Sequence, residues 1–123
     1  MVLVMPPDPE TLDRLAAATV IDITTIGRRS GRPSRIEIWW FRVDGRFVIT
    51  GTPGPRHWLA NLRADPSIVI HAPFGDFPGR AVVIDDPVFR RTVFTSPDTA
   101  WYTTQAELDV LVTTSPMVEV VFD

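Results

Sequence analysis

Cysteine and lysine are both missing from this chain of 123 residues, and histidine occurs only twice, at positions 57 and 71. The lack of cysteine excludes disulfides, thiol nucleophiles and cysteine-ligated metals. Two histidines without carboxylates at a metal-ligand spacing do not form a metal centre, so we predict no metal. No apolar run is long enough to cross a bilayer, and we predict no membrane span.

The chain begins with an apolar stretch, Met1–Met5, that has no basic flank and no small-residue cleavage site. It lacks the features of a signal peptide, and we expect a cytoplasmic protein. Hydrophobic residues make up 45% of the chain and charged residues 22%, as is typical of a folded globular protein. The length suits one domain that covers residues 1–123.

Charge is unevenly distributed along the chain. The formal net charge is -3, whereas general nucleic-acid binders are usually basic, so we predict no nucleic-acid partner. Every basic residue other than histidine is an arginine, and four arginines lie between positions 28 and 35. An acidic protein with one arginine-rich segment favours a local site for an anionic small molecule.

Hydrophobic periodicity and turn residues predict six strands and several short helices. So many strands in a short chain favour a mainly β, α+β fold, an antiparallel six-stranded barrel with helices packed outside. Asp44-Gly45 is a tight hairpin signal, and residues 73–78 are expected to form a loop. The predicted strands cover residues 20–26, 35–43, 46–52, 67–72, 79–84 and 117–122, and the predicted helices cover residues 8–18, 56–64, 85–94 and 99–112.

The segment from Gly27 to Arg35 joins two predicted strands and contains Arg28, Arg29 and Ser30. Its glycines allow a tight turn, and arginine presents a fixed fork of donors that matches phosphate and carboxylate oxygens. We therefore predict an anion site of phosphate type in this segment. The alternative is a solvated hairpin loop that only contributes solubility.

A second segment runs from a strand end into a helix start, and its donors could hold the edge of a heterocycle. The alternative for this segment is an ordinary strand-to-helix turn. It comprises Gly51, Thr52, Pro53, Gly54, Pro55, Arg56 and His57.

Tryptophans stand close to both segments. Trp58 and Asn61 lie three residues apart on the predicted helix, so their N–H groups could reach one anion, although Trp58 could equally belong to the core. Trp39 and Trp40 alternate on a strand, so one is expected in the core and the other is free to border a planar ligand. The pattern alone does not decide between these two tryptophans.

Together these features resemble the deazaflavin-dependent nitroreductase family, which belongs to the split β-barrel flavin and deazaflavin oxidoreductases. The resemblance covers residues 19–72. It implies a six-stranded antiparallel split β-barrel that holds coenzyme F420 in a groove. The motifs that carry it are Thr25-x-Gly27-Arg28-x-Ser30-Gly31-x-x-x-Arg35, Asp44-Gly45, the segment Gly51 to Arg56, and Trp58-x-x-Asn61-Leu62-x-Ala64-x-Pro66.

The resemblance also implies roles for particular residues. Arg28, Arg29, Ser30 and Arg35 would contact the phosphate and tail of the coenzyme, Trp58 and Asn61 would close around the phosphate, and residues 51–56 would lie along the ring. On the substrate side it places Trp39, Trp101 and Tyr102. Family members often have tyrosine where this chain has Trp39, and an indole is a poor acid, so we predict no catalytic side chain.

The implied activity is hydride transfer between F420 and a small, planar conjugated substrate. F420 carries a phosphate and a polyglutamyl tail, and is more anionic than FMN, the alternative cofactor, so four clustered arginines suit it better. Two other functions stay open here: a slow or non-catalytic binding protein for flavin, haem or another tetrapyrrole, and a structural domain whose arginines contact an acidic partner. Exposed tryptophans would favour a homodimer.

Overall fold

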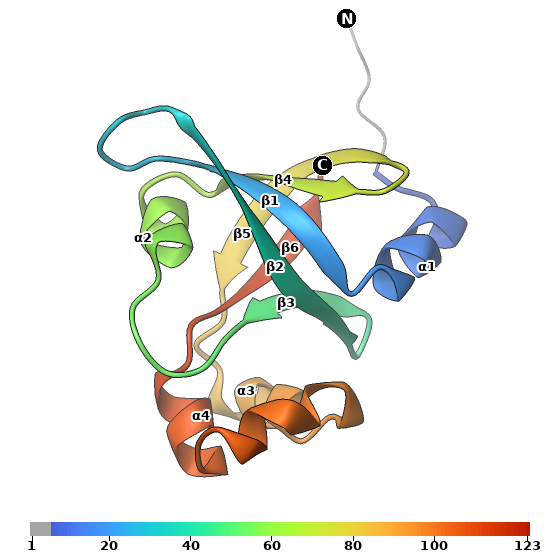
Figure 1. Ribbon diagram of the computed structural model, residues 1–123. Coiled ribbons are helices and arrows are strands. Elements are labelled where there is room, and N and C mark those ends of the chain that lie inside the picture. The colour runs from blue at the N-terminus through green and yellow to red at the C-terminus, as the bar shows by residue number, and fades with distance from the viewer. Residues whose placement is uncertain (1–5) are drawn as a thin grey trace, which may run out of the picture.

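The computed structural model describes residues 6–123 (Figure 1), so the expectation about a signal peptide at Met1–Met5 lies outside the described residues. The helices are α1 (Pro9–Ala17), α2 (His57–Ala64), α3 (Pro87–Phe94), the 3-10 helix η1 (Pro97–Thr104) and α4 (Leu108–Thr114). The strands are β1 (Val20–Ile26), β2 (Pro33–Val43), β3 (Arg46–Thr50), β4 (Ser67–Ala72), β5 (Gly75–Val83) and β6 (Met117–Phe122).

The six strands close into an antiparallel barrel in the order β1-β2-β3-β6-β5-β4, which confirms the predicted fold class. Pairing of β1 with β4 completes the ring. Helices α3 and α4 lie together at one end of the barrel, α1 lies at its side, and α2 lies next to the loop between β1 and β2 (Figure 1). In residues 6–123 no helix is both long and apolar enough to cross a membrane.

Local sequence explains where several elements begin and end. The carboxylate of Asp8 accepts a hydrogen bond from the N–H of Thr11 at 2.8 Å, and Pro9 occupies the first turn of α1. Along β1 the side chains of Ile21, Ile23 and Thr25 alternate into the barrel. The start of α1 and the bounds of β1 agree with the prediction from sequence.

Two expectations about the C-terminal half were wrong. Residues 73–78 are not all loop, because β5 begins at Gly75 and Phe77 pairs with Ile70 of β4. Burial of Phe77 against the barrel core overrides the turn signals around it. The predicted helix over residues 99–112 is instead two helices, because η1 ends where the carbonyl of Tyr102 accepts hydrogen bonds from Gln105 and Ala106.

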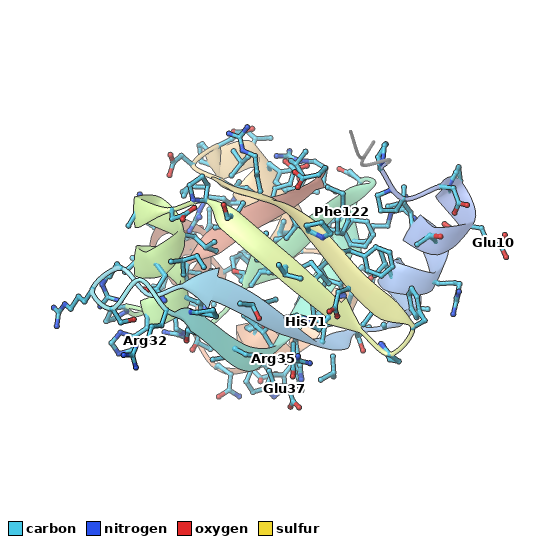
Figure 2. All side chains as sticks on the ribbon, turned by 90° about the horizontal axis from the view of Figure 1, so that it is seen from above. Glu10, Arg32, Arg35, Glu37, His71 and Phe122 are labelled. Atoms are coloured by element: carbon cyan, nitrogen blue, oxygen red, sulfur yellow. The ribbon has the colours of Figure 1, made fainter. Side chains whose placement is uncertain are left out.

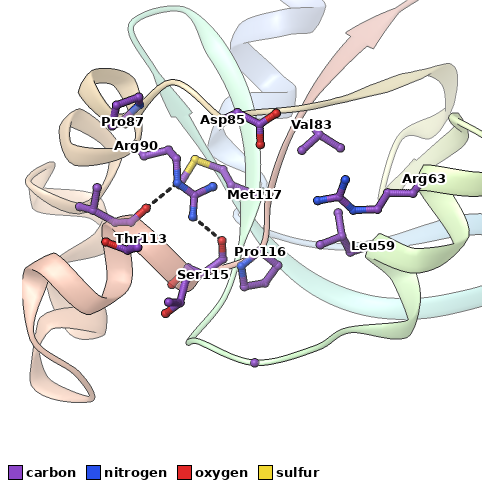
Figure 3. Close-up of a pocket in the computed structure, with 13 residues that line it drawn as sticks. Leu59, Arg63, Val83, Asp85, Pro87, Arg90, Thr113, Ser115, Pro116 and Met117 are labelled. Atoms are coloured by element: carbon purple, nitrogen blue, oxygen red, sulfur yellow. Dashed lines mark hydrogen bonds between the residues drawn. The ribbon is translucent and has the colours of Figure 1, made fainter.

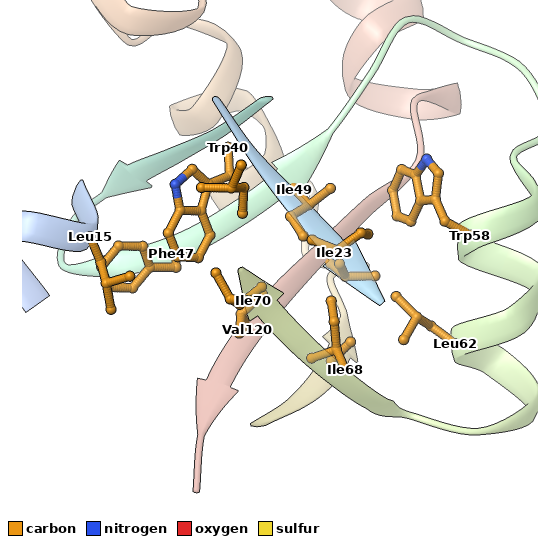
Figure 4. Packing of buried hydrophobic residues seen from close by; sticks show 13 residues of the cluster. Leu15, Ile23, Trp40, Phe47, Ile49, Trp58, Leu62, Ile68, Ile70 and Val120 are labelled. Carbon is orange, nitrogen blue, oxygen red and sulfur yellow. The ribbon is translucent and has the colours of Figure 1, made fainter. Parts of the chain in front are cut away.

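Apolar side chains from all sides fill the barrel (Figure 4). Trp40 is 1% exposed and stacks on Phe47 with ring centroids 4.6 Å apart, and its indole N–H donates to the carbonyl of Ala18 at 2.7 Å. Trp39, its neighbour, is 49% exposed. The structure thereby answers the question that alternation left open, since Trp40 is the core tryptophan and Trp39 is the one on the surface.

A second core lies between the outside of the barrel and the C-terminal helices. Phe41 of β2 and Phe94 of α3 both pack edge-on against Tyr102 of η1, at centroid distances of 6.0 and 5.8 Å. Leu111 of α4 is fully buried in the same cluster. This core fixes η1 against the outer side of β2.

Candidate functional site

The arginine-rich segment forms a compact loop between β1 and β2. The N–H of Gly27 donates to the carbonyl of Arg32, and the N–H of Gly31 donates to the carbonyl of Gly27, each at 2.8 Å. A Cβ atom at Gly27 would lie 2.6 Å from Oγ of Ser30, so a side chain there would force the loop open. The loop therefore has a defined shape, with its arginines on the surface.

Two side chains of helix α2, those of Asn61 and His57, hold Arg28 in place. Its main-chain N–H and its Nη1 both donate to Oδ1 of Asn61, at 3.1 and 3.0 Å, and its Nη2 lies 3.2 Å from Nδ1 of His57. Asn61 is 5% exposed, and its Nδ2 donates to Oγ1 of Thr25 at 3.2 Å. One buried amide thus joins β1, the arginine loop and α2.

Two adjoining hollows flank this junction. The first, the anion hollow, has a volume of about 320 Å³ and contains the arginines Arg28 and Arg29. The second, the ring hollow, has a volume of about 240 Å³ and includes the apolar surfaces of Ile36 and Trp58. Both are lined by Ser34, His57 and Asn61, so the two hollows adjoin, and we call them together the α2 groove.

The segment from Gly51 to Arg56 is organised around the guanidinium group of Arg56. Its Nη2 donates to the carbonyl and to Oγ1 of Thr52, at 2.9 and 3.0 Å, and its Nη1 donates to the carbonyls of Gly54 and Pro55, each at 3.2 Å. Arg56 lines the ring hollow, whereas Gly54 lines a different hollow behind the loop. The guanidinium group therefore shapes the predicted ring-binding segment from within.

Arg35 lies away from the α2 groove. Strand alternation turns Ser34 and Ile36 toward the groove and Arg35 toward the opposite face of β2. There its Nε donates to the carboxylate of Asp22 at 2.9 Å. Arg35 and Glu37 lie on the same side of the barrel (Figure 2).

His71 on that side is hydrogen-bonded at both ring nitrogens. Nε2 lies 2.6 Å from Oγ1 of Thr24, and Nδ1 lies 2.8 Å from Oδ1 of Asp76. This is a hydroxyl–imidazole–carboxylate arrangement that the sequence pattern did not indicate. Thr24 lies within a regular stretch of β1, paired with both β2 and β4, so the arrangement lies on a sheet face and not in a cleft.

The predicted substrate-side residues Trp39, Trp101 and Tyr102 come together although η1 and β2 are distant in sequence. The rings of Trp39 and Trp101 have centroids 6.1 Å apart, and those of Trp101 and Tyr102 have centroids 5.3 Å apart. They line an aromatic hollow of about 490 Å³, together with Phe41 and Arg42. This aromatic hollow shares no lining residue with the α2 groove.

Thr19 and Tyr102 both bring a hydroxyl group to the aromatic hollow, and of these the phenol of Tyr102 can titrate. Burial raises the pKa of Tyr102 above its ordinary value of 10.0, and the positive charge of Arg56 acts in the opposite sense. The phenol is therefore neutral at physiological pH and is a weak acid there. Arg56 lines the ring hollow, and its positive charge also acts on Tyr102 in the aromatic hollow.

Five residues of the α2 groove were not among the predicted coenzyme contacts: Thr25, Gly27, Ser34, Ile36 and His57. Thr25 carried a usable signal, because it begins the motif that ends at Arg35. Ser34 and Ile36 could have been found from the alternation along β2. Among residues 6–123 no group of three or more His, Cys, Asp or Glu residues has metal-binding geometry, and the absence of a metal stays a prediction.

Residues 7–115 match the F420H2-dependent quinone reductase family. The chain belongs to that family. Membership makes it an F420-dependent oxidoreductase, which confirms the predicted enzyme class, the predicted coenzyme and the resemblance noted from the arginine and tryptophan motifs. Among curated proteins, none matches the chain.

Solved structures share the barrel of this F420H2-dependent quinone reductase family member. A conserved hypothetical protein from Mycobacterium tuberculosis is 21% identical, with a TM-score of 0.72 over 97% of this chain and 81% of that one. An F420H2-dependent reductase is 20% identical, with a TM-score of 0.59 over 84% and 94% of the two chains. A FAD-binding protein from Mesorhizobium loti is 14% identical, with a TM-score of 0.65 over 99% and 94%. At such low identity these structures show a common fold.

Proposed function

We propose that the α2 groove is the F420 site of this chain, with the phosphate and acidic tail in the anion hollow and the ring system in the ring hollow. The shared wall of the two hollows carries this proposal, because Ser34, His57 and Asn61 line both. The chemistry of each end suits its part of the coenzyme. Arginines suit phosphate and carboxylate, and the side chains of Ile36 and Trp58 suit a flat, largely apolar ring.

Arg28 and Arg29 play different parts in this proposal. Arg28 is fixed by Asn61 and His57, so its charge is positioned before the coenzyme binds. Arg29 is exposed, and in the described part of the chain its guanidinium group makes no hydrogen bond, so its donors are available to an anion. Ser30 lines the same hollow and its Oγ accepts from the N–H of Arg32 at 3.1 Å, which leaves its own hydrogen free to donate.

When bound, reduced F420 supplies a hydride from its deazaflavin ring. The chain itself contributes position and electrostatics. Ile36 and the exposed edge of Trp58, which is otherwise packed in the barrel core, would contact the ring, and Arg56 places a fixed positive charge at the edge of the ring hollow. No side chain in the groove is required as a nucleophile, which agrees with the absence of cysteine from the sequence.

The aromatic hollow is the proposed anchoring region for the body of the electron acceptor. Because hydride transfer requires direct contact with the deazaflavin ring, the reducible end of the acceptor would have to extend past Arg56 into the ring hollow. Trp39 and Trp101 are 49% and 52% exposed, so their rings are available to a planar, conjugated molecule such as a quinone. Trp101→Ala should raise the KM for a soluble naphthoquinone at least tenfold and leave the Kd of F420 unchanged. A variant that loses F420 binding instead would place Trp101 in the coenzyme site.

Coenzyme choice tests the proposal as a whole. F420 and FMN are titrated separately into the protein, and binding is followed by fluorescence. F420 should bind at least tenfold more tightly, which corresponds to about 1.4 kcal/mol, because its tail adds negative charge beside the arginine loop. Equal binding, or tighter binding of FMN, would refute F420 as the ligand of this groove.

A homodimer is also proposed, because Trp39, Trp101 and Val20 are exposed side by side around the aromatic hollow, where a second copy would form the outer wall of the acceptor site instead of filling it. One structure of the same fold, 17% identical with a TM-score of 0.61 over 91% of this chain and 94% of that one, is described as a domain-swapped dimer. Light scattering after size-exclusion chromatography should give twice the monomer mass. A monomer mass at micromolar concentration would reject the dimer. The cytoplasmic location stays a prediction.

A further inference from the structure

Another hollow lies on the far side of α2 from the groove (Figure 3). His57, Trp58 and Asn61 turn toward the α2 groove, whereas Leu59 and Arg63 turn toward this second space. Its volume is about 410 Å³, and its other walls come from the end of β5, from α3 and from the connection between α4 and β6. We call it the α3–α4 hollow. Neither the coenzyme proposal nor the acceptor proposal uses it.

One wall of the α3–α4 hollow is a buried cation. Arg90 of α3 donates to the main-chain carbonyls of Ile84, Val112 and Ser115, at 2.9 Å in the case of Ile84. These three carbonyls belong to two segments, the end of β5 and the C-terminal end of α4, so the guanidinium group holds the two together. Burial lowers the pKa of Arg90, and the nearby carboxylate of Asp85 opposes that shift, so the arginine remains charged.

A second cation points into the same space. Arg63 extends from α2 toward Pro116 and Met117, and Asp85 faces it across the hollow (Figure 3). Within residues 6–123, Arg63 makes no hydrogen bond or ion pair. The hollow is lined by the guanidinium groups of Arg63 and Arg90 and by one carboxylate, that of Asp85. The negative charge of Asp85 interacts with Arg90, so in the described part of the chain the positive charge of Arg63 is not balanced within the hollow.

The rest of the lining combines apolar side chains with the hydroxyl-bearing residues Thr113, Thr114 and Ser115. Leu59, Val83, Pro116 and Met117 all border the α3–α4 hollow. The volume lies within the range of small-molecule sites, and the mixed lining offers apolar contacts beside polar and charged groups. The free guanidinium of Arg63 can hold a carboxylate through two parallel hydrogen bonds.

We propose that the α3–α4 hollow binds a small organic monoanion, a carboxylate on a compact apolar or aromatic body, with Arg63 as its charge partner. Pro116 and Met117 would contact the body of the ligand, and Arg90 would add long-range positive potential. Gly54 also lines this hollow. An occupant would therefore touch the loop that Arg56 shapes at the edge of the α2 groove.

Benzoate is the probe for this site, added to ¹⁵N-labelled full-length protein both free and loaded with F420, at constant ionic strength. Saturable shifts are expected for the backbone amides of Arg63, Thr113 and Met117, in both forms of the protein. Benzyl alcohol, which has the same body without the charge, should bind at least tenfold more weakly.

Charge variants separate a site from general attraction. Arg63→Gln should weaken benzoate at least tenfold, and Arg63→Lys should weaken it less because the charge is kept. Arg80→Gln removes the same charge from an exposed position on β5 and should leave benzoate binding unchanged. Both arginines are exposed, so folding is expected to survive, and the amide spectrum verifies this directly.

Three results would overturn the proposal. These are an absence of saturable shifts, equal weakening by Arg63→Gln and Arg80→Gln, or shifts confined to Arg28–Ser30. The last would mean that benzoate occupies the anion hollow and that the α3–α4 hollow is a solvated groove. Because binding is measured with free protein as well, these outcomes do not depend on whether F420 occupies the α2 groove.

Discussion

Arg28 and Asn61 are 33 positions apart in the chain, yet the main-chain N–H and the Nη1 of Arg28 both donate to Oδ1 of Asn61. The amide group of Asn61 is buried, and its nitrogen donates in turn to Thr25. A neutral acceptor at this place holds the arginine without cancelling its charge. The relationship therefore explains how the loop can be both ordered and electropositive before the coenzyme binds.

Two substitutions of Asn61 separate its effect on the order of the arginine loop from its effect on the charge beside the anion hollow. Asn61→Ala leaves the part-buried N–H of Arg28 without a partner and removes a buried amide that also binds Thr25, so it should lower the free energy of unfolding by about 1–3 kcal/mol. Asn61→Asp keeps an acceptor for Arg28 but adds a negative charge beside the anion hollow. It should stay close to wild type in urea denaturation while F420 affinity falls at least tenfold. Undiminished F420 binding by Asn61→Asp would show that the phosphate lies elsewhere.

Arg29 is predicted to act on affinity alone. It is exposed and lines the anion hollow, so Arg29→Gln should weaken F420 about tenfold, or about 1.4 kcal/mol, with little change in unfolding free energy. Rising salt should weaken F420 binding more in wild type than in the variant, because one charge contact is screened in the first case only. Arg80→Gln is the charge-matched control. If both variants weaken F420 equally, the arginine loop has no specific role.

Much of the fold and part of the site followed from local pattern. The capping of α1 by Asp8, the alternation along β1 and the arginine cluster are all properties of short segments. The association of Trp39 with Trp101 followed from the family resemblance, and the structure confirms that they meet. Their common environment depends on packing of η1 against β2, which no local pattern encodes.

What the sequence could not show depends on side-chain direction and on tertiary contacts. Arg35 belongs to the cluster in sequence, but strand alternation turns it to Asp22 and away from the groove. Arg56 looked like a ligand donor, yet most of its hydrogen bonds are made within its own loop. Phe77 lies among turn residues and is nonetheless part of a strand, because the barrel core offers it burial.

A substitution at Gly54 tests the shape of the loop from Gly51 to Arg56. The φ angle of Gly54 is +132°, and a Cβ atom there would lie 3.3 Å from Nη1 of Arg56. Gly54→Ala should cost about 1–3 kcal/mol of stability through backbone strain and should also weaken F420 by displacing Arg56. Gly45→Ala is the matched control, because Gly45 has φ +76° with open space around its Cβ position. It should lose stability but keep F420 affinity, and equal loss of affinity in both would reject the role of Arg56.

Tyr102 gives a prediction about pH. Its pKa is raised by burial, so its contribution to stability is present below about pH 10, the value expected in the unfolded chain, and is lost as pH rises through the folded-state pKa. Tyr102→Phe should therefore flatten the decline of unfolding free energy in alkaline solution. At neutral pH its single-turnover hydride transfer should fall less than tenfold, well short of the roughly 10²–10⁴-fold loss typical of a missing general acid. A collapse of that rate with F420 still bound would identify Tyr102 as the acid.

The most direct test of the coenzyme site is an amide and indole chemical-shift map of the ¹⁵N-labelled protein titrated with F420. The largest changes should fall on Arg28, Arg29 and Ser30, on the side-chain amide of Asn61 and on the indole N–H of Trp58, with smaller changes in Thr113–Met117. Changes centred on the α3–α4 hollow or on His71, with the arginine loop unaffected, would contradict the assignment of the α2 groove as the F420 site.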